Sequence, residues 1–258
     1  MNGGAISIAD LKQFIDNSYA KKPKDFKNFE LDKDLSSQRV KVYINPTTRE
    51  AYVVHRGTAS IQDVGNDLKM ALGFDISGSK RVKHAKEVQK KTESKYGKDN
   101  VTTIGHSLGS KIASDVGQDS KAIINLNKAV IPSDLNKQLS SKETNIRSKN
   151  DLISILQPFQ KKGKSVTIEI PALELPSPSA VGLVKSGLQE HKSDILERLP
   201  QDMKVGKGMC NIKKNKMNLR QLKEEVKKIA KERKIKYLIG GKKKGDFKKF
   251  LCGCDKCK

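Results

Sequence analysis

Ser107 lies in the segment Gly105-His106-Ser107-Leu108-Gly109, whose residue types and spacing suit a nucleophilic hydroxyl. An apolar run at 101–104 leads into this segment, and a helix-like run at 110–113 follows it. A serine on a sharp strand-to-helix turn stands clear of the sheet, and the backbone N–H of the next residue faces a developing oxyanion. The two glycines leave room for such a turn. The pattern predicts the nucleophile elbow of a serine hydrolase, with Ser107 as the nucleophile.

A serine nucleophile needs a general base, and the position of the histidines restricts the choice. In folds with this elbow, the triad follows the chain order Ser, then Asp or Glu, then His. Of the four histidines, only His191 follows Ser107 beyond the elbow. His106 is expected to face away from catalysis, because alternate positions around the turn point in opposite directions. His191 is therefore the predicted base, and the alternative is a solvated histidine in the polar loop 189–193.

The acid that orients the base is expected at the end of a strand, beside the carboxyl edge of the sheet. The runs 121–126 and 144–148 have the composition of strands that follow the elbow helix, and Asp151 lies in the segment 150–153 that follows the second. We predict Asp151 as the acid. Asp134, in a Pro-Ser-Asp turn, is the second choice, and Asp115 on the elbow helix is expected to be a surface charge.

A second motif lies upstream, where the apolar run 51–55 ends in Arg56-Gly57-Thr58. Together the two motifs resemble the class 3 (fungal-type) lipase family, in which a strand ending in Arg-Gly-Ser or Arg-Gly-Thr precedes a Gly-His-Ser-Leu-Gly elbow at about this distance. The resemblance covers roughly residues 30 to 200. It implies an α/β-hydrolase fold with a mostly parallel sheet and flanking helices. It also implies a serine esterase that acts on lipid esters, either triacylglycerol or phospholipid.

The same resemblance assigns further roles around the nucleophile. Thr58 matches the family residue whose backbone N–H and hydroxyl line the oxyanion hole, and Leu108 would supply the second N–H. Arg56 and Asp67 match positions that anchor the turn and the segment after it. With the nucleophile, base and acid predicted above, the implied mechanism passes through an acyl-enzyme.

The stretch 61–74 has apolar residues at helical spacing and lies where the resembled lipases carry a lid. The alternative is an ordinary helix packed on the sheet. The segment 63–67 departs from the Asp-Trp-x-x-Asp of the family, and the chain contains no tryptophan. An aromatic anchor for a lipid surface is therefore missing from this place, which favours smaller or water-soluble esters.

Positive charge is spread unequally along the 258 residues. Of the formal net charge of +23, residues 201–258 contribute +14, from 20 basic and 6 acidic side chains. We predict a hydrolase domain at 1–200, a linker at 201–216 and a basic helical tail at 217–258. The tail has a weak likeness to a SAP-type module. Its expected partner is nucleic acid or an anionic membrane surface, and the alternative is a solvated lysine-rich face without a partner.

All the cysteines of the chain lie within residues 201–258. The tail also defines a second hypothesis for function. A catalytically silent, hydrolase-like scaffold could act through the tail alone. No cofactor is predicted for the hydrolase. The cysteine spacing leaves open a zinc site in the tail, and the alternative is that these cysteines are reduced free thiols. The candidate zinc ligands are Cys210, Cys252, Cys254 and Cys257.

The amino-terminal sequence has no basic start followed by an apolar run, so no signal peptide is predicted. No run approaches the roughly 20 apolar residues of a membrane span. We therefore expect an intracellular protein. The family resembles lipase-like hydrolases of large DNA viruses, and the lysine bias suits such a source, which adds association with a virion to this expectation.

Overall fold

A seven-stranded sheet runs through the centre of the molecule, in the order β2-β3-β4-β5-β6-β7-β8. The structure is a computed structural model and describes residues 5–58, 78–161, 163–172 and 186–206. The strands from β4 to β8 are parallel, whereas β2, β3 and β4 pair antiparallel. The strand bounds are β2 Glu30–Leu31, β3 Val40–Ile44, β4 Ala51–His55, β5 Val101–His106, β6 Ala122–Leu126, β7 Glu143–Ser148 and β8 Val166–Ile170.

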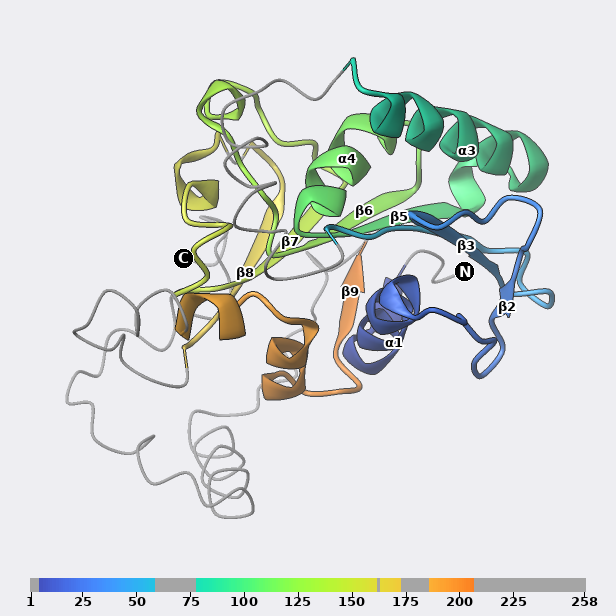
Figure 1. Cartoon of the computed structure of the whole chain (residues 1–258), viewed down its shortest axis with the longest axis horizontal. Coiled ribbons are helices and arrows are strands. Elements are labelled where there is room, and N and C mark those ends of the chain that lie inside the picture. Colours follow the sequence, from blue (N-terminus) through green and yellow to red (C-terminus); the bar gives the residue numbers. More distant parts are fainter. Residues whose placement is uncertain (1–4, 59–77, 162, 173–185, 207–258) are drawn as a thin grey trace, which may run out of the picture.

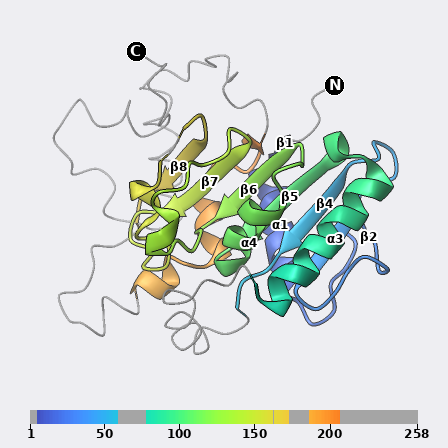
Figure 2. The same cartoon turned by 90° about the horizontal axis from the view of Figure 1, so that it is seen from above.

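Helices cover both faces of this sheet, as Figures 1 and 2 show. Helices α3 (Lys80–Tyr96) and α4 (Leu108–Val116) lie on one face, and α1 (Ile8–Tyr19) lies on the other. Short 3₁₀ turns complete the connections: η1 Lys98–Asn100, η2 Pro132–Asp134, η3 Gln157–Phe159 and η4 Ser193–Arg198. The predicted architecture of a mostly parallel sheet with flanking helices is confirmed.

Helix α1 begins at a defined cap and buries one apolar stripe. Ser7 accepts a hydrogen bond at Oγ from the backbone N–H of Asp10 (3.1 Å), which satisfies one of the free donors at the start of the helix. Leu11, Phe14 and Ile15 follow at the spacing of one helix face, and all three are buried. This stripe packs α1 against the sheet.

The two ends of the described domain pair with each other in a small sheet. β1 (Ala5–Ser7) runs antiparallel to β9 (Lys204–Gly206), and Val205 is fully buried. Residues 204–206 were predicted to be linker, so the folded domain extends at least six residues beyond the predicted boundary at 200. Their pattern is too short to identify a strand without its partner. The remainder of the predicted linker and the tail lie outside the described residues.

The strands at the centre of the sheet present different side chains to its two faces. Alternate residues of β5 to β7, such as Ile104, Ile124 and Ile146, join α1, η4 and β9 in the main apolar cluster; we call this side the apolar face. The intervening positions carry Thr103, Asn125 and other buried polar residues under α3 and α4, and we call this side the polar face. Position along each strand therefore decides between an apolar and a polar environment.

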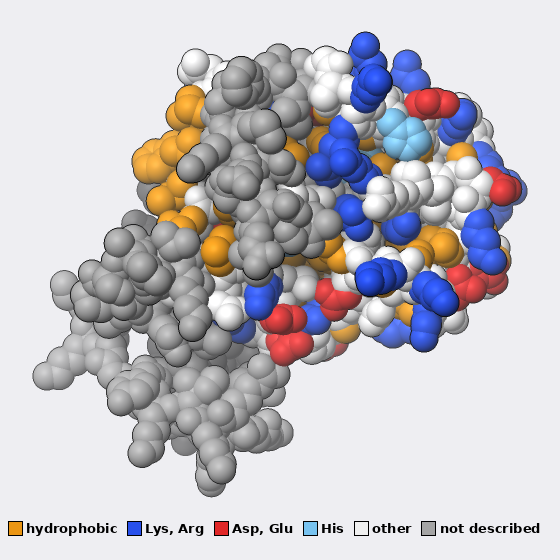
Figure 3. All heavy atoms as spheres, in the orientation of Figure 1, with side chains coloured by type: hydrophobic (Ala, Val, Ile, Leu, Met, Phe, Trp, Pro, Cys, Tyr) orange, Lys and Arg blue, Asp and Glu red, His pale blue; other side chains and the backbone are white. Residues whose placement is uncertain are grey.

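Basic side chains are not confined to the predicted tail. Figure 3 shows lysine and arginine side chains over the described part of one face, with acidic residues between them. Helix α3 exposes Lys83, Lys86 and Lys90. Within the part of the chain that the structure describes, no helix has the length and apolar character required to cross a membrane.

Candidate active site

Ser107 forms the turn between β5 and α4 and has a strained backbone. Its φ is 59° and its ψ is −129°, a combination that residues with a side chain rarely adopt. The backbone around it is held by hydrogen bonds: its N–H donates to the carbonyl of Leu126 (3.0 Å), and its carbonyl accepts from Ala129 (3.2 Å). The predicted strand, turn and helix are confirmed, and Ser107 has the conformation of a nucleophile elbow.

The glycines on either side of the turn are required by close packing. A Cβ at Gly109 would lie 2.1 Å from the carbonyl oxygen of His55 at the end of β4. A Cβ at Gly105 would lie 2.4 Å from the Cα of Ser110 in α4. Both distances are far below van der Waals contact, so the elbow and its neighbouring strand approach only because these side chains are absent.

The turn that follows β4 lies against the nucleophile. A Cβ at Gly57 would lie 2.7 Å from the Cβ of Ser107, and the next residue, Thr58, is half-buried. Leu108 is the first residue of α4, directly after the nucleophile. The two residues predicted to form the oxyanion hole therefore come from segments that meet at Ser107. Arg56 is held at the same turn, with its guanidinium carbon 5.9 Å from the centre of the Tyr19 ring.

The predicted base and acid are in direct contact. Nδ1 of His191 lies 2.9 Å from Oδ1 of Asp151, although 40 residues separate them in the chain. Asp151 is 1% exposed, and its two carboxylate oxygens also accept the backbone N–H groups of Ile153 (3.1 Å) and Ser154 (3.0 Å). A carboxylate only accepts hydrogen bonds, so Nδ1 of His191 carries the hydrogen of this bond. The lone pair of the neutral ring then lies on Nε2.

Nε2 of His191 is buried and has no hydrogen-bond partner among the described residues. Ser107 is 5% exposed and His191 6% exposed, and no hydrogen bond joins them. In proteins without substrate, the hydrogen bond between nucleophile and base is often long or poorly aligned, and it tightens when substrate binds. The free Nε2 is the atom that a general base requires.

The other candidate acids lie away from His191. Asp134 is buried in an ion pair with Lys111, at 2.7 Å. Burial acts to raise the pKa of Asp134, but the hydrogen bonds and charge of Lys111 outweigh it, so the pKa is lowered. Asp115 is exposed on α4, as predicted for a surface charge. Among the three candidates, Asp151 is the one bonded to a histidine.

His106 does not face away from the site, which corrects the prediction made for it. It shares a strand face with Ile104 and so points towards the apolar face, where the segment that carries His191 also lies. Its Nε2 lies 2.8 Å from the carbonyl oxygen of His191, and the two ring centres are 5.0 Å apart. Its Nδ1 lies 2.7 Å from the hydroxyl of Tyr19. His106 does point to the opposite side from Ser107, as the alternation of positions predicted. The sequence did not show that the segment of His191 also lies on that side.

Asn127 and Glu190 hold the loop of the base, and neither was predicted. Asn127 adopts a positive φ of 47°. Its Nδ2 donates to the backbone carbonyl of Glu190 (3.0 Å), and its Oδ1 accepts from the N–H of Ser148 (3.1 Å). The Glu190 carboxylate accepts from Arg198 (2.7 Å) and from the hydroxyl of Ser148. In the sequence, the only indication of a role for Glu190 was its position next to His191.

Several predicted features lie outside the described residues. These are the stretch 61–74 with its proposed lid, Asp67, the tail at 217–258, and the candidate zinc ligands Cys210, Cys252, Cys254 and Cys257. Within the described ranges, no group of three or more His, Cys, Asp or Glu side chains could hold a metal ion.

Comparison with known proteins finds similarity at the level of structure. No protein-family model matches the chain, and no curated protein matches it in sequence. Among solved structures, it is similar to the Rhizomucor miehei lipase propeptide complex, with 14% identity, 63% of this chain and 67% of the other covered, and a TM-score of 0.40.

Two further lipases show the same level of similarity. The Lip2 lipase of Yarrowia lipolytica is 14% identical over 66% of this chain and 80% of its own, with a TM-score of 0.43. A triacylglycerol lipase of Penicillium expansum is 17% identical over 64% and 80%, with a TM-score of 0.40. All three of these structures are fungal lipases. The similarity concerns the fold, and the chemistry below rests on the geometry of the site itself.

Proposed function

We propose that this chain is a serine carboxylic-ester hydrolase in which Ser107 is the nucleophile, His191 the general base and Asp151 the orienting acid. The hydrogen bond of 2.9 Å between His191 and Asp151, with Nε2 of the ring left free, carries the proposal. The strained turn at Ser107 supports it, because such strain persists at functional sites where the surrounding structure enforces it.

In the proposed reaction, Oγ of Ser107 forms a bond to the ester carbonyl carbon while its proton passes to Nε2 of His191. The negative charge that develops on the carbonyl oxygen is stabilised by the N–H groups of Thr58 and Leu108. The tetrahedral intermediate collapses, the alkoxide leaves with the proton from His191, and an acyl-enzyme remains. Water then attacks the acyl carbon by the same route, which releases the carboxylic acid and the free serine.

Lipid esters, either triacylglycerols or phospholipids, are the proposed substrates. The support for this class is the resemblance of the two motifs to the class 3 lipases. Smaller esters remain part of the proposal, because the chain has no tryptophan to anchor a lid in a lipid surface.

The decisive experiment replaces the nucleophile. Ser107→Ala is expected to lower kcat for a chromogenic acyl ester by about 10⁴-fold or more, because a missing nucleophile removes the covalent route. A fluorophosphonate probe should label the wild-type chain at Ser107 and leave the variant unlabelled. Unfolding transitions of both proteins control for loss of the fold. Unchanged turnover in a folded variant would contradict the proposal.

A catalytically silent scaffold is the second candidate function. The observation that favours it is the missing hydrogen bond between Ser107 and His191. In this case the wild-type chain would neither hydrolyse esters nor react with the probe, and its activity would lie in the binding of nucleic acid or anionic membrane by residues 217–258. A comparison of the full chain with one that ends at Gly206, for binding to duplex DNA and to anionic vesicles, tests that partner. The salt dependence of any DNA binding would report the number of phosphate contacts.

A further inference from the structure

We propose that Tyr19 and His106 are positioning residues, which join the turn at Gly57 to the backbone of His191 through one continuous chain of hydrogen bonds. The chain begins at the N–H of Gly57, which donates to the hydroxyl of Tyr19 (2.7 Å). It continues from that hydroxyl to Nδ1 of His106 (2.7 Å) and from Nε2 of His106 to the carbonyl of His191 (2.8 Å). The inference rests on the proposed function, since it assigns a role in holding that site.

The direction of every proton in this chain follows from its two ends. A backbone carbonyl only accepts, so Nε2 of His106 must carry the hydrogen that it shares with His191. The other nitrogen of a neutral ring is then an acceptor, and the hydroxyl of Tyr19 must donate to it. The lone pairs of that hydroxyl remain free to accept the N–H of Gly57. One tautomer of His106 satisfies all three contacts.

Both side chains are held in the protonation states that this arrangement needs. Burial is the main cause and the neighbouring His191 the second cause that together lower the pKa of His106 to about 3, so the ring is neutral. Burial raises the pKa of Tyr19 to about 12, so its hydroxyl keeps the proton that it donates. A neutral His106 also avoids a second positive charge beside His191 when the base takes the proton of the nucleophile.

The two ends of the chain are parts of the proposed machinery. Gly57 precedes Thr58, the proposed oxyanion residue, and His191 is the proposed base. Tyr19 is the last residue of α1 and lies 87 residues before His106 in the chain, so the helix on the apolar face reaches the site. Figure 1 shows α1 on the side of the sheet opposite α4, whose first turn follows the nucleophile. A shift of the Tyr19 hydroxyl would therefore move the oxyanion turn and the base together.

The first test reads the tautomer directly and does not depend on activity. In long-range ¹H–¹⁵N NMR spectra of the full chain, His106 is expected to show a protonated Nε2 and an unprotonated Nδ1. Tyr19→Phe removes the donor to Nδ1 but leaves the carbonyl of His191, so Nε2 should stay protonated while the Nδ1 resonance shifts to that of a nitrogen without a hydrogen bond. Tyr43→Phe is the matched control, because the Tyr43 ring is buried against Phe14 of α1 and its hydroxyl is not part of the chain of bonds from Gly57 to His191.

The second test measures turnover of a short-chain ester. Tyr19→Phe is expected to lower kcat by about tenfold with little change in KM, since it removes two hydrogen bonds that hold the site. His106→Leu removes the donor to His191 and should lower kcat by about 100-fold. His106→Gln places an amide N–H where Nε2 was, so it should recover most of that loss. Tyr43→Phe should match the wild type.

The outcomes separate this inference from the proposed function. A wild-type His106 protonated at Nδ1 would overturn it, and so would an active enzyme in which Tyr19→Phe behaves like Tyr43→Phe. If His106→Leu does not fold, Tyr19→Phe and His106→Gln decide alone. A wild-type chain that neither hydrolyses esters nor labels with fluorophosphonate overturns the proposed function, and the catalytic role of the chain of bonds falls with it.

Discussion

The apolar and polar faces of the central sheet are stabilised in different ways. On the apolar face, Ile104, Ile124 and Ile146 pack against α1, η4 and β9, and the free energy comes from the removal of hydrocarbon from water. On the polar face, α3 and α4 cover buried amides, hydroxyls and ion pairs. The first face depends on shape and area, whereas the second depends on hydrogen bonds and ion pairs among its buried polar groups.

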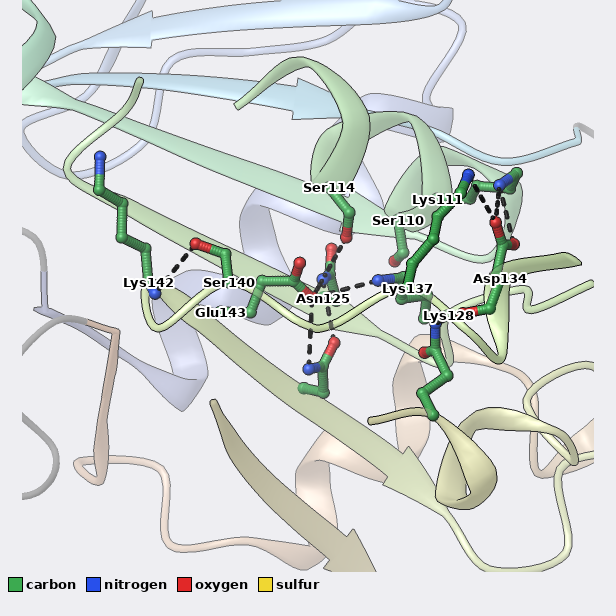
Figure 4. A network of polar contacts seen from close by, with 12 residues as sticks. Ser110, Lys111, Ser114, Asn125, Lys128, Asp134, Lys137, Ser140, Lys142 and Glu143 are labelled. Carbon is green, nitrogen blue, oxygen red and sulfur yellow. Dashed lines mark hydrogen bonds and ion pairs between the residues drawn. The ribbon is translucent and has the colours of Figure 1, made fainter. Parts of the chain in front are cut away.

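The polar face contains two buried ion pairs, which Figure 4 shows together with their neighbours. Nζ of Lys128 lies 3.1 Å from Oε2 of Glu143, and both side chains are at most 6% exposed. The same carboxylate accepts from the amide of Asn125 (3.3 Å). The second pair joins Lys111 and Asp134. Pairs of this kind contribute little net stability when complete, but the loss of one partner leaves an uncompensated charge.

Lys128→Met is expected to produce the largest effect, because it leaves the Glu143 carboxylate buried without its cation. The free energy of unfolding should fall by about 3–5 kcal/mol. In the double variant Lys128→Met with Glu143→Gln, a neutral side chain still accepts from Asn125, and most of the loss should be recovered. Urea denaturation of the three proteins gives the values. Equal destabilisation of the single and double variants would show that the charge is not the cause.

Ile124→Ala tests the apolar face by the same measurement. This fully buried residue should cost about 2–5 kcal/mol, from lost burial and the cavity that remains. Ile124→Val is the matched variant with a smaller cavity and should cost about 1 kcal/mol. Both losses should be independent of pH and salt, because no charge is involved. A strong salt dependence would mean that the two faces are not separate in their energetics.

The smallest expected effect is a dependence on pH that comes from Asp134. Its pKa is lowered in the folded protein, so its contribution to stability is present above the ordinary carboxylate pKa of about 4 and is lost as the pH falls through the lowered value. Lys111→Met removes the main cause of that lowering. The difference in unfolding free energy between wild type and Lys111→Met should therefore shrink below about pH 4, whereas the difference for Ile124→Val should stay constant.

The sequence predicted the features that arise from local pattern and chain order. The strands β4, β5 and β6 were visible as short apolar runs, β7 by its strand-like composition, and the elbow as two glycines around Ser107. The contact of Asp151 with His191 agrees with the rule that carboxyl ends of parallel strands meet at one edge. These features need no knowledge of which distant residues pack together.

The remainder depends on contacts that a single sequence does not encode in a recognisable form. Asn125 and Asn145 lie inside strands and are fully buried, yet their residue type alone predicts exposure. Tyr19 gave no sign of its partner, because it ends an ordinary amphipathic helix. Glu190 and Asn127 were missed for the same reason, since each acts through a residue far away in the chain.

The pairing of β1 with β9 determines how the domain responds when its ends are pulled apart. Ala5 lies opposite Gly206, so force applied at these two points separates three residue pairs one after another, beginning with the outermost. The next element along the chain is α1, whose last residue is Tyr19. Tension between the ends would thus reach the hydroxyl beside His106 before it reaches any strand of the central sheet.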